Sequence, residues 1–345
     1  MSLKQAGAST SASQFVVYTQ NEKLLWLIRT DGTDERRLTD GPEDYDAKWS
    51  PDGKHIAFTR VMSHKAGEVM SDADIWVIAA DGTGLTQLSS GPEFDGVEGW
   101  SPDGKSVIFT RQGKGAGKYR VKLDGSNPNR IDGDRSHTKT SFDGQWWAKV
   151  MPIRDGEEEH ESNLWFGRSG DLKGHKIKQT YGENYGPVWS PTANQFVAFV
   201  QVPGNPRSSK LILVKPADGT VRGLLSRSEL YIEDPTWSAD GKRIAFLMSK
   251  GGEPMTNASF RQLYVMDANG RNFRRLTDHW CDDFTPQWTR DGKSIVVQGT
   301  RGMTNHPGSG VSGSPTSYVV VVQADGSGEQ VLLGTAAAYG VAVQP

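Results

Sequence analysis

The stretch that decides the fold is WSPDGKHIAFTR, at Trp49–Arg60, because the chain repeats it. Close copies are WSPDGKSVIFTR from Trp100, WSPTANQFVAFV from Trp189, WSADGKRIAFLM from Trp237 and WTRDGKSIVVQG from Trp288, and a degenerate copy, TSFDGQWWAKVM, begins at Thr140. Their successive starts lie 51, 40, 49, 48 and 51 residues apart. A period of this length indicates a repeat architecture.

Each copy predicts a strand, a tight turn and a second strand. The Trp ends the first strand, and in Ser-Pro-Asp-Gly the Pro presets φ while the Gly takes the position that needs a positive φ. Alternating residues such as Ile56 and Phe58 then form the second strand. A second phrase follows, with Asp-Gly or Asn-Gly joining a third strand to a fourth, as in DIWVIAADGTGLTQL, KLILVKPADGTVRGLL, QLYVMDANGRNFRRLT and SYVVVVQADGSGEQVLL. Four short strands per repeat predict a β-propeller blade.

The two ends of the chain complete one another. FVVYTQ and KLLWLIRTDGTDERRLT, near the N-terminus, supply strands two to four of a blade that lacks its first strand. The C-terminal AAAYGVAVQP matches a first strand, and aligning Pro345 with Pro51 puts Val343, 55 residues after Trp288, at the position of Trp49. We therefore expect an all-β, seven-bladed propeller of four-stranded blades, closed by pairing of the N- and C-terminal strands, which leaves no open sheet edge. Six blades with a frayed end are the alternative.

Composition sets the remaining bounds. We expect residues 14–345 to form one domain, preceded by a flexible linker at 1–13. A net charge of −2 provides no basic stripe for nucleic acid, and no apolar run approaches the length needed for membrane insertion. The single cysteine, Cys281, excludes an intrachain disulfide. We expect a monomer.

Loop lengths separate two faces of the predicted ring. One face carries the short Ser-Pro-Asp-Gly and Asp-Gly turns. The opposite face carries the long segments, which are Val61–Asp74, Arg154–Ser162, Val202–Ser209, Lys250–Arg261 and Arg301–Ser317. Loops of this length are usually functional or mobile, so we place the working surface on this face.

The segments that lead into the first strands on that face are acidic and aromatic. The residues expected to bind a ligand are Asp44, Tyr45, Asp46, Asp95, Arg135, His137, Tyr185, Glu233, Asp234, Trp280 and Asp283. Converging carboxylates can hold Ca²⁺ or another divalent cation, for which Asp46, Asp95, Asp234 and Asp283 are the candidates, or they can bind cationic groups. The alternative is structural: such Asp residues hydrogen-bond their own turns, and the aromatic rings pack between blades.

Catalytic motifs are scarce. The chain has no G-x-S-x-G nucleophile elbow and no phosphate-binding loop. His137 and His279 stand beside acidic residues at the starts of blades, so they are the candidates for catalysis.

The repeat resembles that of TolB-like (WD-type) propellers, most closely at Leu263–Thr277, and the resemblance covers about residues 14–345. It implies a non-enzymatic module that captures a protein segment or a small ligand, and a periplasmic or extracellular location. More distantly the chain resembles oligogalacturonate lyases, which implies a metal-assisted carbohydrate lyase or hydrolase as the alternative, although their His-rich motif matches no segment here. A third interpretation is a scaffold whose blade rims contact partner proteins.

Overall fold

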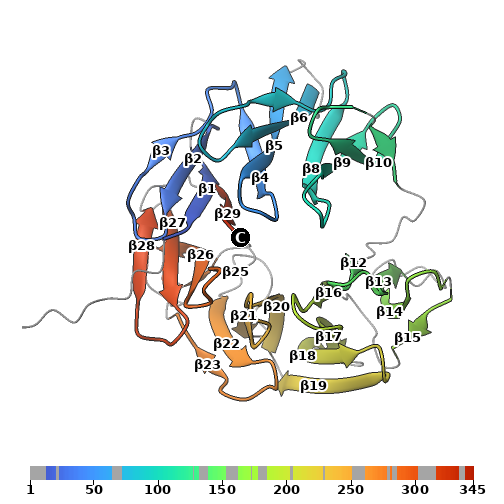
Figure 1. The fold of residues 1–345 in the computed structure, drawn as a ribbon. Helices are drawn as coiled ribbons and strands as arrows, with labels where there is room; N and C mark the ends of the chain where they lie inside the picture. The colour runs from blue at the N-terminus through green and yellow to red at the C-terminus, as the bar shows by residue number, and fades with distance from the viewer. Residues whose placement is uncertain are drawn as a thin grey trace, which may run out of the picture.

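The computed structural model describes residues 13–20, 23–63, 72–126, 128–131, 139–152, 162–171, 173–177, 185–202, 205–227, 230–250, 261–277, 280–281, 286–301, 316–333 and 339–345. Within these ranges every regular element is a β-strand, which confirms the all-β prediction. Figure 1 shows the sheets arranged around a common centre. Strands β4, β8, β16, β20 and β25 lie on the inner side, and β3, β19, β23 and β28 lie on the outer side.

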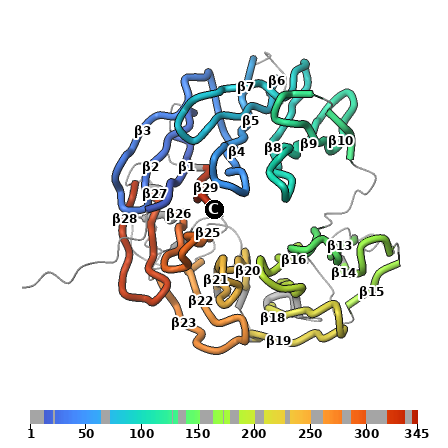
Figure 2. Tube along the Cα trace, in the orientation of Figure 1, coloured from blue at the N-terminus to red at the C-terminus, as the bar shows by residue number. Residues whose placement is uncertain are grey.

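One sheet combines both ends of the chain, and we call it the terminal unit. Its order is β29-β1-β2-β3, with β29 at Tyr339–Val343, β1 at Phe15–Thr19, β2 at Leu25–Arg29 and β3 at Arg36–Arg37. Val16 pairs with Val343, and Val17 pairs with Ala342. Figure 2 shows the blue N-terminal strand beside the red C-terminal strand.

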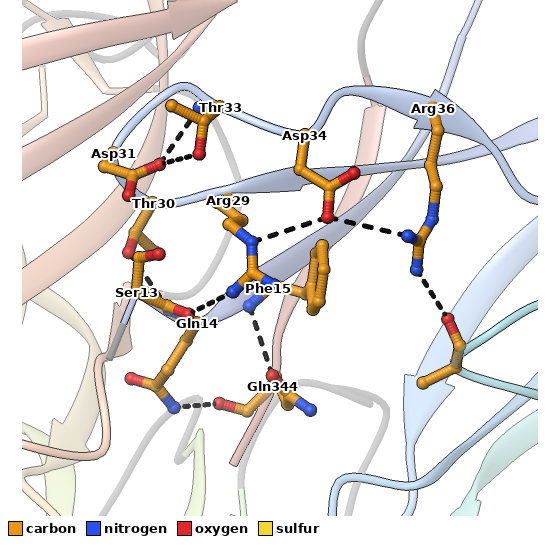
Figure 3. Close-up of polar contacts among 11 residues, drawn as sticks. Ser13, Gln14, Phe15, Arg29, Thr30, Asp31, Thr33, Asp34, Arg36 and Gln344 are labelled. Atoms are coloured by element: carbon orange, nitrogen blue, oxygen red, sulfur yellow. Dashed lines mark hydrogen bonds and ion pairs between the residues drawn. The ribbon is translucent and has the colours of Figure 1, made fainter.

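Side chains reinforce this pairing (Figure 3). Gln14 Nε2 donates to the backbone oxygen of Gln344 at 2.5 Å, and the backbone N–H of Phe15 donates to Gln344 Oε1 at 3.2 Å. The Arg29 guanidinium lies 4.2 Å from the centroid of the Phe15 ring and pairs with Asp34. The last strand is therefore held by both backbone and side-chain contacts.

The next two repeats share an eight-stranded sheet. The first comprises β4 (Asp44–Trp49), β5 (His55–Ser63), β6 (Asp72–Ala79) and β7 (Thr86–Gln87), and the second comprises β8 (Phe94–Trp100), β9 (Ser106–Gln112), β10 (Gly117–Lys122) and β11 (Asn129–Arg130). Pairing within each repeat is antiparallel, and a short parallel contact between Ala73 and Phe94 joins the two repeats. We call them the β4–β7 unit and the β8–β11 unit.

The other repeats form four separate antiparallel sheets among the described residues. The β12–β15 unit comprises β12 (Lys139–Thr140), β13 (Trp146–Pro152), β14 (Ser162–Arg168) and β15 (His175–Lys176), and the β16–β19 unit comprises β16 (Tyr185–Trp189), β17 (Phe196–Val202), β18 (Asn205–Lys215) and β19 (Thr220–Arg227). The β20–β23 unit comprises β20 (Leu230–Trp237), β21 (Arg243–Lys250), β22 (Gln262–Asp267) and β23 (Arg274–Arg275), and the β24–β28 unit comprises β24 (Trp280–Cys281), β25 (Gln287–Trp288), β26 (Ser294–Arg301), β27 (Thr316–Gln323) and β28 (Glu329–Leu333).

The Ser-Pro-Asp-Gly turns form as the sequence predicts. Ser50 Oγ donates to Asp52 Oδ1 at 2.6 Å, the backbone N–H of Lys54 donates to the same oxygen at 3.1 Å, and Gly53 has a φ of +69°. The hydrogen bond from Ser50, followed by that from Lys54, lowers the pKa of Asp52. The same arrangement recurs at Asp103, Asp143, Asp240 and Asp291.

Neighbouring units pack through aliphatic and aromatic side chains and through the Trp of the repeat. Between the terminal unit and the β4–β7 unit, for example, Val17 and Leu27 lie in one buried cluster with Phe58. The indole Nε1 of Trp100 donates to the backbone oxygen of Lys48 at 2.9 Å, and that of Trp237 donates to Val188 at 2.9 Å. In each case the acceptor stands immediately before the Trp of the preceding unit, because Lys48 comes before Trp49 and Val188 comes before Trp189.

Candidate functional site

The predicted acidic residues that the structure describes lie in inner strands, and two of them are buried in ion pairs. Asp44, in β4, is fully buried, and Arg60 binds both of its oxygens, with Nε–Oδ1 at 2.6 Å and Nη2–Oδ2 at 2.8 Å. The Arg60 guanidinium also lies 4.9 Å from the centroid of the Trp76 ring. This carboxylate is therefore engaged within its own sheet.

Asp95 repeats this arrangement in the next unit. It is buried, and Arg111 binds it through Nε–Oδ1 at 2.7 Å and Nη2–Oδ2 at 2.6 Å. Each Arg follows its Asp by 16 residues, at the end of the F-T-R triplet that only the phrases from Trp49 and Trp100 contain. That shared triplet is the sequence signal from which these pairs could have been predicted. Glu233 likewise pairs with a cation, the Arg261 guanidinium.

Asp46 and Asp234 have a different environment and an uncommon backbone. Asp46 is exposed, Asp234 is half-buried, and their φ values are +55° and +48°. Each stands three residues before the Trp of its repeat, inside a β-bulge of an inner strand. Gly340, with a φ of +63°, occupies the matching place before Val343 in β29. Burial, followed by the charge of Glu233, raises the pKa of Asp234.

A buried polar group lies beside Asp46. A Cβ placed on Gly340 would be 3.5 Å from Thr19 Oγ1 and 3.9 Å from the backbone N of Asp46, so the three residues are neighbours. Thr19 is fully buried, and its hydroxyl has no hydrogen-bond partner among the described residues. One unit further along the chain, Thr59 holds the position of Thr19 and Val97 holds that of Asp46. There the backbone N–H of Val97 donates to Thr59 Oγ1 at 3.0 Å. At the left-handed Asp46, the equivalent hydrogen bond to Thr19 is not made.

One further group extends the site, and another has an environment equivalent to that of Thr19. Tyr45 lies next to Asp46, and its burial, followed by the charges of Asp46 and Glu43, raises the pKa of its phenol to about 12. Gln298, at the position of Thr19 in the β24–β28 unit, is buried, and its Oε1 has no hydrogen-bond partner among the described residues. Gln298 lies in the unit before the one that contains the left-handed Gly340, just as Thr19 lies in the unit before the one that contains the left-handed Asp46.

Asp74, in β6, is a buried acid that the repeat pattern did not indicate as a site residue. It is 3% exposed, and Gln87 Nε2 donates to its Oδ2 at 2.9 Å. Burial, followed by the charges of Asp72 and Asp95, raises the pKa of Asp74 to about 6. The sequence predicted a loop over Val61–Asp74, whereas β5 extends to Ser63 and β6 begins at Asp72.

The remaining predicted residues are only partly placed. Tyr185 and Trp280 lie in β16 and β24, respectively. Arg135, His137, His279 and Asp283 lie outside the described residues, as do most of the long loops. In the part of the chain that is described, no three His, Cys, Asp or Glu side chains gather as a metal site requires, so Asp46, Asp95 and Asp234 do not form one there. The described residues also form no helix long and apolar enough to cross a membrane.

Comparisons with known proteins establish the fold. No family model matches the chain. An uncharacterized peptidase of Bacillus subtilis, YuxL, is 39% identical over 64 residues, which is 19% of this chain and only 9% of that protein's length. TolB from Acinetobacter baumannii superposes with a TM-score of 0.53 and 15% identity over 98% of this chain and 81% of its own. An oligogalacturonate lyase in complex with manganese gives 0.60 and 14% over 93% and 84%. The fold is that of the TolB-like propellers, as the repeat predicted.

Proposed function

We propose that the chain is a seven-bladed propeller, its ring closed through the pairing of β1 with β29, that captures a protein segment or a small ligand at the mouth of its central channel. The binding group is built around Asp46 and Tyr45 in β4 and Asp234 in β20. The observation that carries this proposal is the left-handed backbone of the two aspartates.

A left-handed conformation costs a non-glycine residue about 1 kcal/mol or more, and such strain is concentrated at functional sites. Gly340 adopts the same conformation at the same place in the terminal unit without that cost. Glycine would therefore serve the bulge equally well at Asp46 and Asp234. A carboxylate at both positions supports a role for the charge itself.

The neighbouring groups favour a ligand that donates hydrogen bonds. Asp46 is exposed, and the adjacent Tyr45 carries a neutral phenol whose pKa is raised further by burial. Carboxylate and hydroxyl oxygens accept from amide N–H and ammonium groups, while the Tyr45 ring provides an apolar face. In this proposal the buried pairs of Asp44 with Arg60 and of Asp95 with Arg111 hold the inner strands in place and do not contact the ligand.

Selection from a random-peptide phage library tests the proposal, with the purified protein immobilised as bait. The double variant Asp46→Asn/Asp234→Asn keeps residues that tolerate a left-handed backbone but removes both charges. The control Asp124→Asn/Asp218→Asn removes two charges from turns of other units. We expect the control to bind selected peptides as the wild type does, and the site variant to bind them at least tenfold more weakly with an unchanged Tm. Equal binding, or a large loss of Tm in the site variant, contradicts the proposal.

The metal-assisted carbohydrate enzyme is tested by elemental analysis of the purified protein. A stoichiometric transition metal, together with cleavage of an oligosaccharide, would replace the binding proposal.

The proposed location outside the cytoplasm is tested by fractionation of the native host, and the proposed monomer by sedimentation equilibrium. Neither of these depends on the identity of the ligand.

A further inference from the structure

Two positions on the third strand of each unit pack against the next unit, and one unit departs from this rule. In the others the two positions hold buried hydrophobic residues, namely Leu25 and Leu27, Ile75 and Val77, Leu164 and Phe166, Leu211 and Leu213, Leu263 and Val265, and Val319 and Val321. In β10 the same register positions, opposite Thr110 and Ile108, are Lys118 and Arg120. The β8–β11 unit therefore presents cations where its counterparts present a core.

The rest of that face is also polar. Glu98 pairs with Lys118 and accepts a hydrogen bond from Thr110, and Arg120 is exposed, with no acidic partner among the described residues. Ile108 is half-buried on the same face. The opposite face of this sheet is ordinary, because Val107, Phe109 and Val121 pack in a buried cluster with the β4–β7 unit. Only the face toward the following repeat is altered.

The following β12–β15 unit is altered in a matching way. Lys149 takes the position that holds Phe58, Phe109 and Phe246 in other repeats, and its Nζ lies 5.1 Å from the centroid of the Trp147 ring. Thr140 stands where the repeat has Trp, so no indole is available to reach back to the β8–β11 unit. Lys139 beside it is exposed. Among the described residues, the buried clusters that join other neighbouring units have no counterpart here.

We infer that the facing surfaces of the β8–β11 and β12–β15 units form an interface for an acidic polypeptide segment. Lys118, Arg120 and Lys149 place three cations on these faces, and Glu98 pairs with Lys118. Arg120 has no acidic partner among the described residues, so packing it against an apolar or cationic surface would bury its charge without compensation, which is strongly unfavourable, whereas a carboxylate would neutralise it through two parallel hydrogen bonds.

A polypeptide suits this place better than other polyanions. An extended chain presents successive side chains to opposite sides, so it can contact two sheet faces at once. The half-buried Ile108 adds apolar surface beside the cations, which suits a segment that alternates acidic and aliphatic residues. This interface uses residues other than Asp46 and Asp234, so it stands or falls independently of the proposed channel-mouth site.

Fluorescence anisotropy provides the test, with a labelled octapeptide of alternating Glu and Val as the probe and its Lys-Val counterpart as the negative probe. The variant Lys118→Leu/Arg120→Val restores the residue types of the other repeats, and Lys118→Gln/Arg120→Gln removes the charges while keeping polar side chains of intermediate length. The control Lys54→Leu/Lys293→Val makes the same change of charge at exposed turn residues of other units.

We expect the wild type and the control to bind the Glu-Val peptide with an affinity that falls steeply with salt, and both site variants to bind it at least tenfold more weakly. The Leu/Val variant should also gain thermal stability, because aliphatic packing replaces the cations. Retention of binding by both site variants overturns the inference. So does tighter binding of a sulfated oligosaccharide or a single-stranded oligonucleotide of equal charge, or unfolding of the Gln/Gln variant.

Discussion

The indole Nε1 of Trp49 donates a hydrogen bond to the backbone oxygen of Ala342, 3.1 Å away and 293 residues later in the chain. It is the same bond that Trp100, Trp189, Trp237 and Trp288 make to the preceding units. The C-terminal strand therefore contacts the β4–β7 unit as an ordinary first strand would. Val343 has no indole, and the Gln287 side chain reaches the strand in its place, with Nε2 2.6 Å from the oxygen of Val341 and Oε1 2.8 Å from the N of Val343.

The Trp49 bond can be removed without removing the ring. Trp49→Phe keeps a buried aromatic side chain but leaves the Ala342 carbonyl without its donor, which we expect to cost about 1 to 2 kcal/mol of unfolding free energy. Urea denaturation followed by fluorescence measures it. Trp26→Phe is the matched control, because the Trp26 Nε1 has no hydrogen-bond partner among the described residues. An equal loss in both variants would show that the indole bond contributes nothing of its own.

The Asp44–Arg60 pair should behave as one buried unit. Asp44→Ala leaves the Arg60 charge buried without its partner, and we expect it to cost about 3 to 5 kcal/mol. Arg60→Ala should cost a similar amount, and the double variant should cost much less than the sum of the two. A double-mutant cycle by chemical denaturation measures this coupling. Additive losses would contradict the paired geometry.

Asp74 should make the wild type progressively less stable, relative to a variant that cannot titrate at this position, as the pH rises from about 4 to about 7. Its pKa is raised from 3.8 to about 6, so over this range the folded state binds more protons than the unfolded state. Asp74→Asn stays neutral, and we expect it to be more stable than the wild type at pH 8, by on the order of 2 kcal/mol, with a difference that disappears near pH 4. Thermal melts across this range measure it, and a constant difference would refute the assignment.

The left-handed backbone of Asp46 predicts opposite effects for two small residues. Asp46→Gly relieves the strain and should raise the unfolding free energy or leave it unchanged, whereas Asp46→Ala should lower it by about 1 kcal/mol. Differential scanning calorimetry of the two variants measures the gap. The same comparison at Lys48, whose φ is not positive, should favour Ala over Gly.

Much of the fold could be predicted because its signals are local. The Ser-Pro-Asp-Gly turn at Ser50 and the Asp-Gly hairpin at Asp81 each fix a few dihedral angles, and both formed where the sequence placed them. The first-strand character of Tyr339–Val343 came from comparison with the other repeats, and it pairs with β1. The limits of β5 and β6 were less predictable, because Ser63 and Asp72 extend their strands through polar residues that resemble a loop.

The sequence by itself determined the period of the repeat, its turns, and the inner strands in which the acidic residues lie. Only the tertiary structure decided which acids are available, since it buries Asp44 and Asp95 against arginines and leaves Asp46 exposed in a left-handed bulge. The physical reason is that turn geometry and strand alternation depend on neighbours along the chain. Burial, ion pairing and the loss of a partner at Thr19 depend instead on how strands from different units meet.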